Sequence, residues 1–260
     1  MAEFTKHEPH TFCWLDLGTS DTASAKEFYS ELFGWEPFDT PAGEEGVYTM
    51  LNKNGKPAAA LYELSEQQKQ MNIPPHWMTY ITVDDAEESS KKADSLGGKI
   101  LMGPIDVMGE GKMSLVQDPE GGLVGLWQPM KHIGAAYKQE HGALAWTEFG
   151  THDKSKPVPF YEGLCGWKAD TQPMGEGEYT LFKMGEQMAA GLYEMPEGME
   201  DIPPHWLPYI QVDNIDKALE TVDKHDGEIM MPKMHAPGVG HFSVVRDPQG
   251  AVFGLIQSDM

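Results

Sequence analysis

The chain has 260 residues, 40% of them hydrophobic, so it is long enough for two domains with sizeable cores. Its formal net charge of −22, from 41 acidic and 19 basic residues, disfavours nucleic acid and anionic membranes as partners. No apolar run approaches the roughly 18 residues of a transmembrane helix. The N-terminus lacks a secretory signal, so we expect a cytoplasmic protein. Two cysteines without a Cys-x-x-Cys motif argue against disulfides and structural zinc.

The first 64 residues predict a strand, a helix and then further strands. Residues 11–17 alternate as a strand, and the helix that follows carries apolar residues at spacings of three and four. Thr19 or Ser20 can cap this helix, and Gly34 ends it. A hairpin with its turn at Asn54-Gly55 comes next, followed by a polar connection.

The same order then starts again with the stretch Pro74-Pro75-His76-Trp77. Its strand continues to Val83, and Asp84 can cap an acidic helix. More strands follow, with a tight turn at Asp118-Pro119-Glu120-Gly121. By residue 128 the order β-α-β-β-β has appeared twice.

The whole pattern is then repeated, with Pro203-Pro204-His205-Trp206 and a second Asp-Pro-x-Gly turn at Asp247. We therefore expect a first domain over 9–129, a linker over 130–141 and a second domain over 142–258. Pro157 and Pro159 stand where the first domain has helix interior, so the corresponding helix should start late and be short.

These repeats identify a family resemblance over roughly residues 10–258. The specific signals are the two Pro-Pro-His-Trp strands, the two Asp-Pro-x-Gly turns followed by Gly-Leu, and Ala25-Lys26-Glu27-Phe28-Tyr29 ending at Phe33-Gly34-Trp35. The chain resembles tandem-domain glyoxalase/bleomycin-resistance/dioxygenase-like proteins of the vicinal oxygen chelate superfamily. The resemblance implies an α+β fold, in which four β-α-β-β-β modules form two domains with curved mixed sheets around cavities. This superfamily includes metal enzymes and also metal-free proteins that sequester antibiotics.

The resemblance also implies where a metal would bind, with His, Glu or Gln ligands on the first and last strands of each module. Alignment by strand ends places no such ligand there; the positions fall at about Phe12, Leu61, Met78 and Gly125, and at Leu144, Leu192 (or Gly191), Leu207 and Gly254. Divalent ions need oxygen or nitrogen donors, so we expect no metal cofactor. The alternative is a displaced metal site at His76 and His205, each of which could instead bond the backbone after Pro-Pro.

Strand alternation predicts the residues that line the cavities. Aromatic walls of this kind suit a planar or apolar ligand, although they could also be plain core filling. The predicted ligand-binding residues are Phe12, Trp14, His76, Met78, Tyr80, Trp146, His205, Leu207, Tyr209 and Gln211, and the prediction also turns Leu144 and Thr82 inward.

Asp16 and Glu148 are carboxylates at matching inward positions of otherwise apolar strands. Burial would raise their pKa, so each is a candidate catalytic base or ligand-orienting acceptor. The alternative is a hydrogen bond to a nearby Tyr or Trp, or a solvated strand end. Lys112 and His241 also match, and could offer positive charge at the cavity mouth or lie in solvated loops.

We therefore expect a small-molecule-binding protein of the glyoxalase/bleomycin-resistance type without the family's metal centre. The alternative is an enzyme, either a lyase, an isomerase or a ring-cleaving dioxygenase, using a cavity carboxylate or a displaced histidine metal site. A scaffold for protein partners would not require matched carboxylates. The protein could be a monomer or a homodimer, since the tandem repeat already pairs the modules.

Overall fold

The computed structural model describes residues 4–43, 46–137, 140–175 and 177–259. The first half of the chain contains β1 (Phe12–Thr19), α1 (Thr22–Phe33), β2 (Glu36–Ala42), β3 (Gly46–Lys53), β4 (Lys56–Glu63), α2 (Glu66–Gln70), β5 (His76–Thr82), α3 (Ala86–Ser95), β6 (Lys99–Asp106), β7 (Gly111–Gln117) and β8 (Leu123–Pro129). The second half contains β9 (Leu144–Thr151), α4 (Pro157–Cys165), β10 (Lys168–Met174), β11 (Gly177–Met184), β12 (Gln187–Glu194), β13 (His205–Gln211), α5 (Ile215–Lys224), β14 (Glu228–Ala236), β15 (Gly240–Arg246) and β16 (Val252–Ser258).

Each half forms one eight-stranded mixed sheet of the same connectivity. The strand orders are β2-β3-β4-β1-β5-β8-β7-β6 and β10-β11-β12-β9-β13-β16-β15-β14. β1 and β5, the first strands of the two modules, are antiparallel neighbours at the centre of their sheet, and β9 and β13 occupy the same place in the other. The α+β fold of four modules in two tandem domains is confirmed.

Several element boundaries differ from the sequence prediction. The caps of α1 and α3 are Asp21 and Asp85, because each carboxylate accepts bonds from two backbone amides of the first turn. The polar connection contains the short helix α2, which begins with a capping box at Ser65. Helix α4 does begin late, at Pro157, and has 9 residues against 12 in α1.

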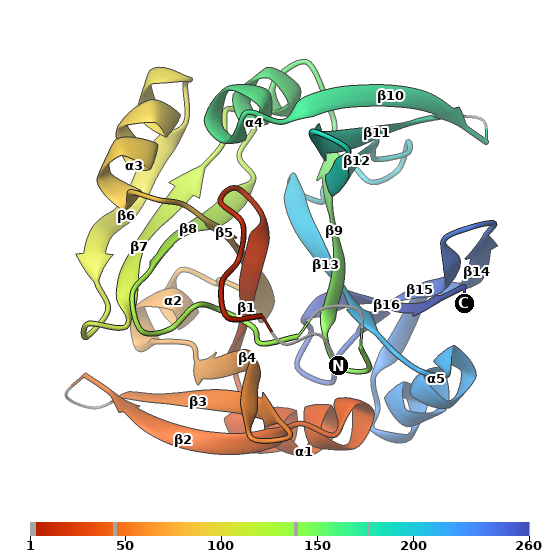
Figure 1. Cartoon of the computed structure of the whole chain (residues 1–260). Coiled ribbons are helices and arrows are strands. Elements are labelled where there is room, and N and C mark those ends of the chain that lie inside the picture. Colours follow the sequence, from red (N-terminus) through yellow and green to blue (C-terminus); the bar gives the residue numbers. More distant parts are fainter. Residues whose placement is uncertain (1–3, 44–45, 138–139, 176, 260) are drawn as a thin grey trace.

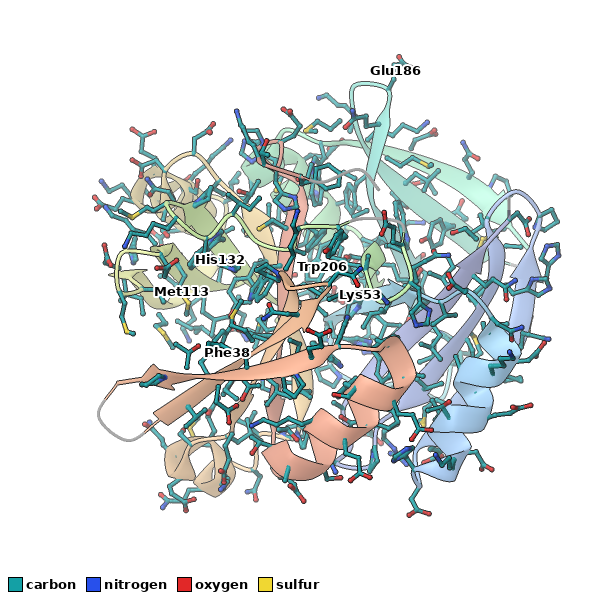
Figure 2. All side chains as sticks on the ribbon, turned by 60° about the horizontal axis from the view of Figure 1, so that its bottom comes forward. Phe38, Lys53, Met113, His132, Glu186 and Trp206 are labelled. Atoms are coloured by element: carbon teal, nitrogen blue, oxygen red, sulfur yellow. The ribbon has the colours of Figure 1, made fainter. Side chains whose placement is uncertain are left out.

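The two sheets share one apolar core. Figure 1 shows α1 beside α5 and α3 beside α4, so the helices of one domain lie against helices of the other. Between them, Trp77 and Trp206 of the repeated motif are buried among aromatic rings, and Figure 2 places Trp206 near the centre of the molecule. Cys13 and Cys165 are both buried. Within the described residues, no helix is long and apolar enough to cross a bilayer.

A buried relay of hydrogen bonds crosses this core twice. Trp77 Nε1 donates to the Tyr29 hydroxyl over 3.1 Å, and that hydroxyl donates to Asp247 Oδ2 of the other domain over 2.8 Å. Trp206, Tyr161 and Asp118 repeat the arrangement at 2.8 and 3.0 Å. Each Asp-Pro-x-Gly turn is thus bonded to the first helix of the opposite domain.

The relay should contribute measurably to stability. Tyr29→Phe removes a hydroxyl that satisfies two buried groups, so we expect a loss of about 1–3 kcal/mol of unfolding free energy in urea titrations. Tyr161→Phe should cause a similar loss, because it removes the matching hydroxyl. Phe38→Ala, at a side chain that is 64% exposed, is the control and should change stability little. A Tyr29→Phe protein as stable as this control would contradict the assignment.

Candidate functional site

The first candidate site lies on the face of the first sheet that is turned away from the shared core. Asp16 of β1 is buried there and accepts two hydrogen bonds at Oδ2, from Tyr48 at 3.0 Å and from Tyr80 at 3.1 Å. Trp14 Nε1 donates to the Tyr48 hydroxyl over 3.0 Å and so fixes its orientation. Met78 lies in the same apolar cluster.

The second sheet repeats this cluster with one extra methylene. Glu148 of β9 accepts from Tyr179 at Oε2 over 2.9 Å and from Tyr209 at Oε1 over 2.7 Å. Trp146 Nε1 donates to the Tyr179 hydroxyl over 3.0 Å. Leu207 occupies the place that Met78 has in the first sheet.

The two carboxylates differ in what remains available for a ligand. In Glu148, each oxygen has a tyrosine partner. In Asp16 both tyrosines bind Oδ2, and Oδ1 is buried without a hydrogen-bond partner among the described residues. A buried acceptor without a partner is costly, so the shorter side chain leaves Asp16 Oδ1 as the acceptor that a bound donor would satisfy.

Burial also controls the protonation of both carboxylates. Desolvation raises the pKa of Asp16 to about 7, against the opposing effect of the two tyrosine hydrogen bonds. It raises the pKa of Glu148 as well, again against its two tyrosine bonds. Asp16 is thus poised to exchange a proton near neutral pH.

The predicted aromatic residues Trp14, Tyr80, Trp146 and Tyr209 all contribute to these clusters, but the two histidines of the repeated motif do not bond the carboxylates. His76 Nδ1 donates to the Pro74 carbonyl over 2.8 Å, and His205 Nδ1 donates to the Pro203 carbonyl over 2.9 Å.

Gln211 is buried at the other end of its strand. Its side-chain oxygen accepts a hydrogen bond from Ser258 of β16 over 2.9 Å.

Phe12 and Leu144 depart from the inward orientation that strict alternation predicts. The register shifts between Phe12 and Trp14, and the pairing of β13 with β9 shifts at the equivalent place, between Tyr209 and Ile210. These bulges turn both side chains into the shared core, where the ring centroid of Phe12 lies 4.9 Å from that of Trp206.

Lys112 and His241 also lie elsewhere than at a cavity mouth. Their neighbours Met113 and Phe242 pack with the carboxylate clusters, so alternation directs Lys112 and His241 to the opposite, helix-covered face. Lys112 accordingly approaches Glu87 of α3, with Nζ and Oε1 3.4 Å apart. Both residues therefore lie on strands β7 and β15 rather than in solvated loops, and neither faces a carboxylate cluster.

The geometry of these faces does not suit a metal ion. Gly125 and Gly254 hold two of the implied ligand positions, and the rings of Tyr80 and Tyr209 lie directly on them. A Cβ atom at either glycine would lie 2.1 Å from a tyrosine Cδ1. Leu61 and Leu192 belong to the shared core. Each carboxylate is engaged by tyrosines, and among the described residues no group of three His, Cys, Asp or Glu ligand atoms converges at either face.

The segment that links the domains covers the first of the two faces. Ala135 N donates to the Cys13 carbonyl over 2.7 Å, and the His132 ring packs edge-on against Trp14 at 4.5 Å between centroids. Figure 2 places His132 near Met113 of β7. Burial lowers the pKa of His132 to about 4, so it is neutral at physiological pH.

The equivalent positions of the second domain are more accessible. Trp146 and Glu148 are partly exposed, whereas their counterparts Trp14 and Asp16 are 4% and 5% exposed. Surface grooves of about 340 and 460 Å³ lie elsewhere, beside α5 and α3; the first is lined mainly by charged residues, and the second by charged, polar and apolar residues.

Sequence reasoning missed Tyr48 and Tyr179, which hold the carboxylates from β3 and β11. Both follow a glycine by two residues and precede a threonine, in Gly46-Val47-Tyr48-Thr49 and Gly177-Glu178-Tyr179-Thr180. Aligning the two halves would therefore have found the pair. No local pattern indicates that residues 130–137 return to cover the first sheet.

Two curved sheets of this connectivity define a tandem protein with the vicinal oxygen chelate fold. A family model described as the Glyoxalase/Bleomycin resistance protein/Dioxygenase superfamily matches residues 10–126 and 143–255. The chain therefore belongs to this superfamily, as its motifs predicted.

Related proteins align with almost the whole length of the chain. CFP32 of Mycobacterium tuberculosis, which is provisionally named a glyoxylase, is 36% identical over 259 residues, covering 99% of this chain and 98% of CFP32. The anthracycline biosynthesis protein DnrV of Streptomyces peucetius is 28% identical over 265 residues, covering 97% and 95%. Among solved structures, the Mn(II)-bound glyoxalase of Novosphingobium aromaticivorans matches with a TM-score of 0.67 at 15% identity, covering 96% of this chain and 82% of that one. At that identity the likeness shows the fold alone.

Substitution of Gly254 tests the close approach of Tyr209. In Gly254→Ala the new methyl group displaces the ring from Glu148, and we expect a loss of about 1–3 kcal/mol in thermal or urea unfolding. Gly177→Ala is the matched control, because the nearest atom to its Cβ lies 3.9 Å away. Equal stability of the two variants would show that the position of the Tyr209 ring does not depend on the missing side chain at Gly254.

Asp16 should also give stability a characteristic pH dependence. The folded protein keeps the proton up to about pH 7, whereas the unfolded chain releases it near the ordinary value of 3.8. Wild type should therefore lose up to about 4 kcal/mol relative to Asp16→Asn as pH rises from about 4 to 7, with no further change above it. Urea unfolding of both proteins across this range measures the difference. Glu27→Gln, at an exposed carboxylate, should follow wild type, and an Asp16→Asn curve parallel to wild type would refute the assignment.

Proposed function

We propose that the chain binds a small, planar organic molecule on the carboxylate-bearing faces of its sheets, without a metal ion at the family's usual positions. The observation that carries this proposal is the matched pair of tryptophan–tyrosine–carboxylate clusters. Each combines aromatic surface with a polar group of fixed orientation, which is the usual composition of a small-molecule site. The tyrosine rings over Gly125 and Gly254 support the metal-free part, because they fill the space that ligand side chains would need.

The second face is the better candidate for direct binding. Trp146 and Glu148 are partly exposed there, so a ligand can reach them without displacing the linker. Glu148 already binds two hydroxyls, and its oxygens keep lone pairs for a further donor such as a phenol. Similarity to DnrV, an anthracycline biosynthesis protein, supports fused aromatic phenols as the ligand class.

A second candidate function is catalysis by a carboxylate base, such as an isomerase or lyase reaction on an acidic C–H bond. The raised pKa of Asp16, about 7, favours it, because a base is most effective when its pKa is near the working pH. Asp16 Oδ1 would take the proton. In this reading the linker would exclude water from the reacting face.

Ligand titration distinguishes the two. We expect an anthracycline or another polycyclic phenol to quench tryptophan fluorescence saturably, and Glu148→Gln and Trp146→Phe to weaken binding about tenfold, equivalent to 1.4 kcal/mol. Phe38→Ala, at an exposed aromatic side chain outside both clusters, is the control and should retain the affinity.

Activity assays complete the test. The binding proposal expects no turnover of methylglyoxal–glutathione hemithioacetal or of catechols with added Ni²⁺, Zn²⁺, Fe²⁺ or Mn²⁺. Metal-dependent turnover would reject it. Metal-independent turnover that disappears in Asp16→Asn or Glu148→Gln would instead favour the carboxylate-base enzyme.

A further inference from the structure

We infer that His235, His241 and Asp259 form a binding site for a borderline divalent cation such as Zn²⁺, Ni²⁺ or Cu²⁺. The site lies at the turn end of the β14–β15 hairpin, on the helix-covered side of the second sheet and away from its carboxylate cluster. One ligand atom from each of the three residues lies within 4.8 Å of the other two. The inference is independent of the proposed function.

The sheet places the two imidazoles next to each other. His235 and His241 are direct cross-strand partners, and their ring centroids are 4.5 Å apart with planes inclined by 34°. Side chains opposite each other on antiparallel strands project from the same face, so both rings are presented to one point. His235 and Asp259 are exposed and His241 is half-buried, so a cation can reach the site from solvent.

The backbone brings the third ligand to this pair. Asp259 N donates to the Val239 carbonyl, and Gly238 N donates to Asp259 Oδ2, both over 3.2 Å. The same Oδ2 lies 3.4 Å from His235 Nε2. The hairpin turn therefore holds the carboxylate in position, as outer-shell hydrogen bonds do in metal sites.

Gly240 allows this approach of the segment after β16. Its φ is +133°, and a Cβ there would lie 2.1 Å from the Gln257 carbonyl oxygen and 2.9 Å from Asp259 N. Figure 1 shows the end of β16 beside β14 and β15.

The first domain lacks this ligand set at the same positions, although the two halves share their fold. Asp106 and Lys112 are the cross-strand pair there, and Met130 follows Pro129 as Asp259 follows Ser258. That arrangement offers one carboxylate, from Asp106, and the positively charged ammonium group of Lys112, which repels a metal ion. The three ligands thus distinguish one copy of an otherwise duplicated structure.

The chemistry of the ligands selects the ion. Imidazole nitrogens suit Zn²⁺, Ni²⁺ and Cu²⁺, whereas Ca²⁺ and Mg²⁺ prefer oxygen ligands. Three protein ligands leave at least one coordination position for water. A bound ion would connect the hairpin to the segment after β16.

Calorimetric titration of the full chain, purified without a histidine tag, tests the site. We expect one Zn²⁺ per chain, with Cu²⁺ binding tighter and a tenfold excess of Ca²⁺ over Zn²⁺ failing to compete. His235→Gln and His241→Gln should each weaken binding at least about tenfold, since even outer-shell changes cost that much. Electron paramagnetic resonance of the copper-bound protein should show nitrogen hyperfine coupling. The double variant, which combines His235→Gln and His241→Gln, should lose this coupling.

His76→Gln/His205→Gln is the matched control, because it removes one histidine from each sheet and leaves this site intact. Zinc binding that is absent, that Ca²⁺ displaces, or that the control removes as well as the double variant would overturn the inference. Far-ultraviolet circular dichroism of each variant separates loss of binding from loss of folding.

Discussion

A tyrosine hydroxyl bonded to a carboxylate occurs on both sides of both sheets, and the architecture depends on it. Between the sheets, Tyr29 and Tyr161 each bind the aspartate of the opposite domain. On the outer faces, Asp16 and Glu148 each bind two tyrosines from neighbouring strands. A carboxylate in an apolar setting is costly unless hydrogen-bonded, so each one fixes the position of the rings around it. The same interaction thus joins the domains and shapes the candidate sites.

The carboxylate clusters on the outer faces of the two sheets differ in side-chain length and in exposure. The side chain at position 16 is buried and one methylene shorter than its counterpart, which leaves one oxygen without a partner among the described residues, and the linker packs on the neighbouring Trp14. The second face keeps the longer side chain with both oxygens bonded and partly exposed. The Asp16 cluster is therefore buried and poised for proton exchange. The Glu148 cluster is accessible, and both of its carboxylate oxygens have hydrogen-bond partners.

The sequence predicted the features that arise from local periodicity and from the duplication. The module order follows from the repeated motifs, the late start of α4 from its prolines, and the placing of each carboxylate on the same face as its tryptophan from alternation within a single strand. The orientations of Phe12 and Leu144 could not be obtained this way, because a one-residue bulge reverses the side-chain direction without changing the composition. The tyrosine partners and the covering linker are contacts between distant segments, which no single stretch encodes. The cluster at His235 depends on strand register and on a turn that brings Asp259 back.

The relay between Tyr29 and Asp247 joins positions 218 residues apart, near opposite ends of the chain. Its counterpart joins Tyr161 to Asp118 across the linker. During synthesis the first sheet can therefore form its own strand pairs, but its inner face stays without its carboxylate partner until the last strands have emerged. Contacts of such long sequence separation are formed late and slowly. We therefore expect the two domains, which share one strand order, to fold as one cooperative unit rather than as two independent ones.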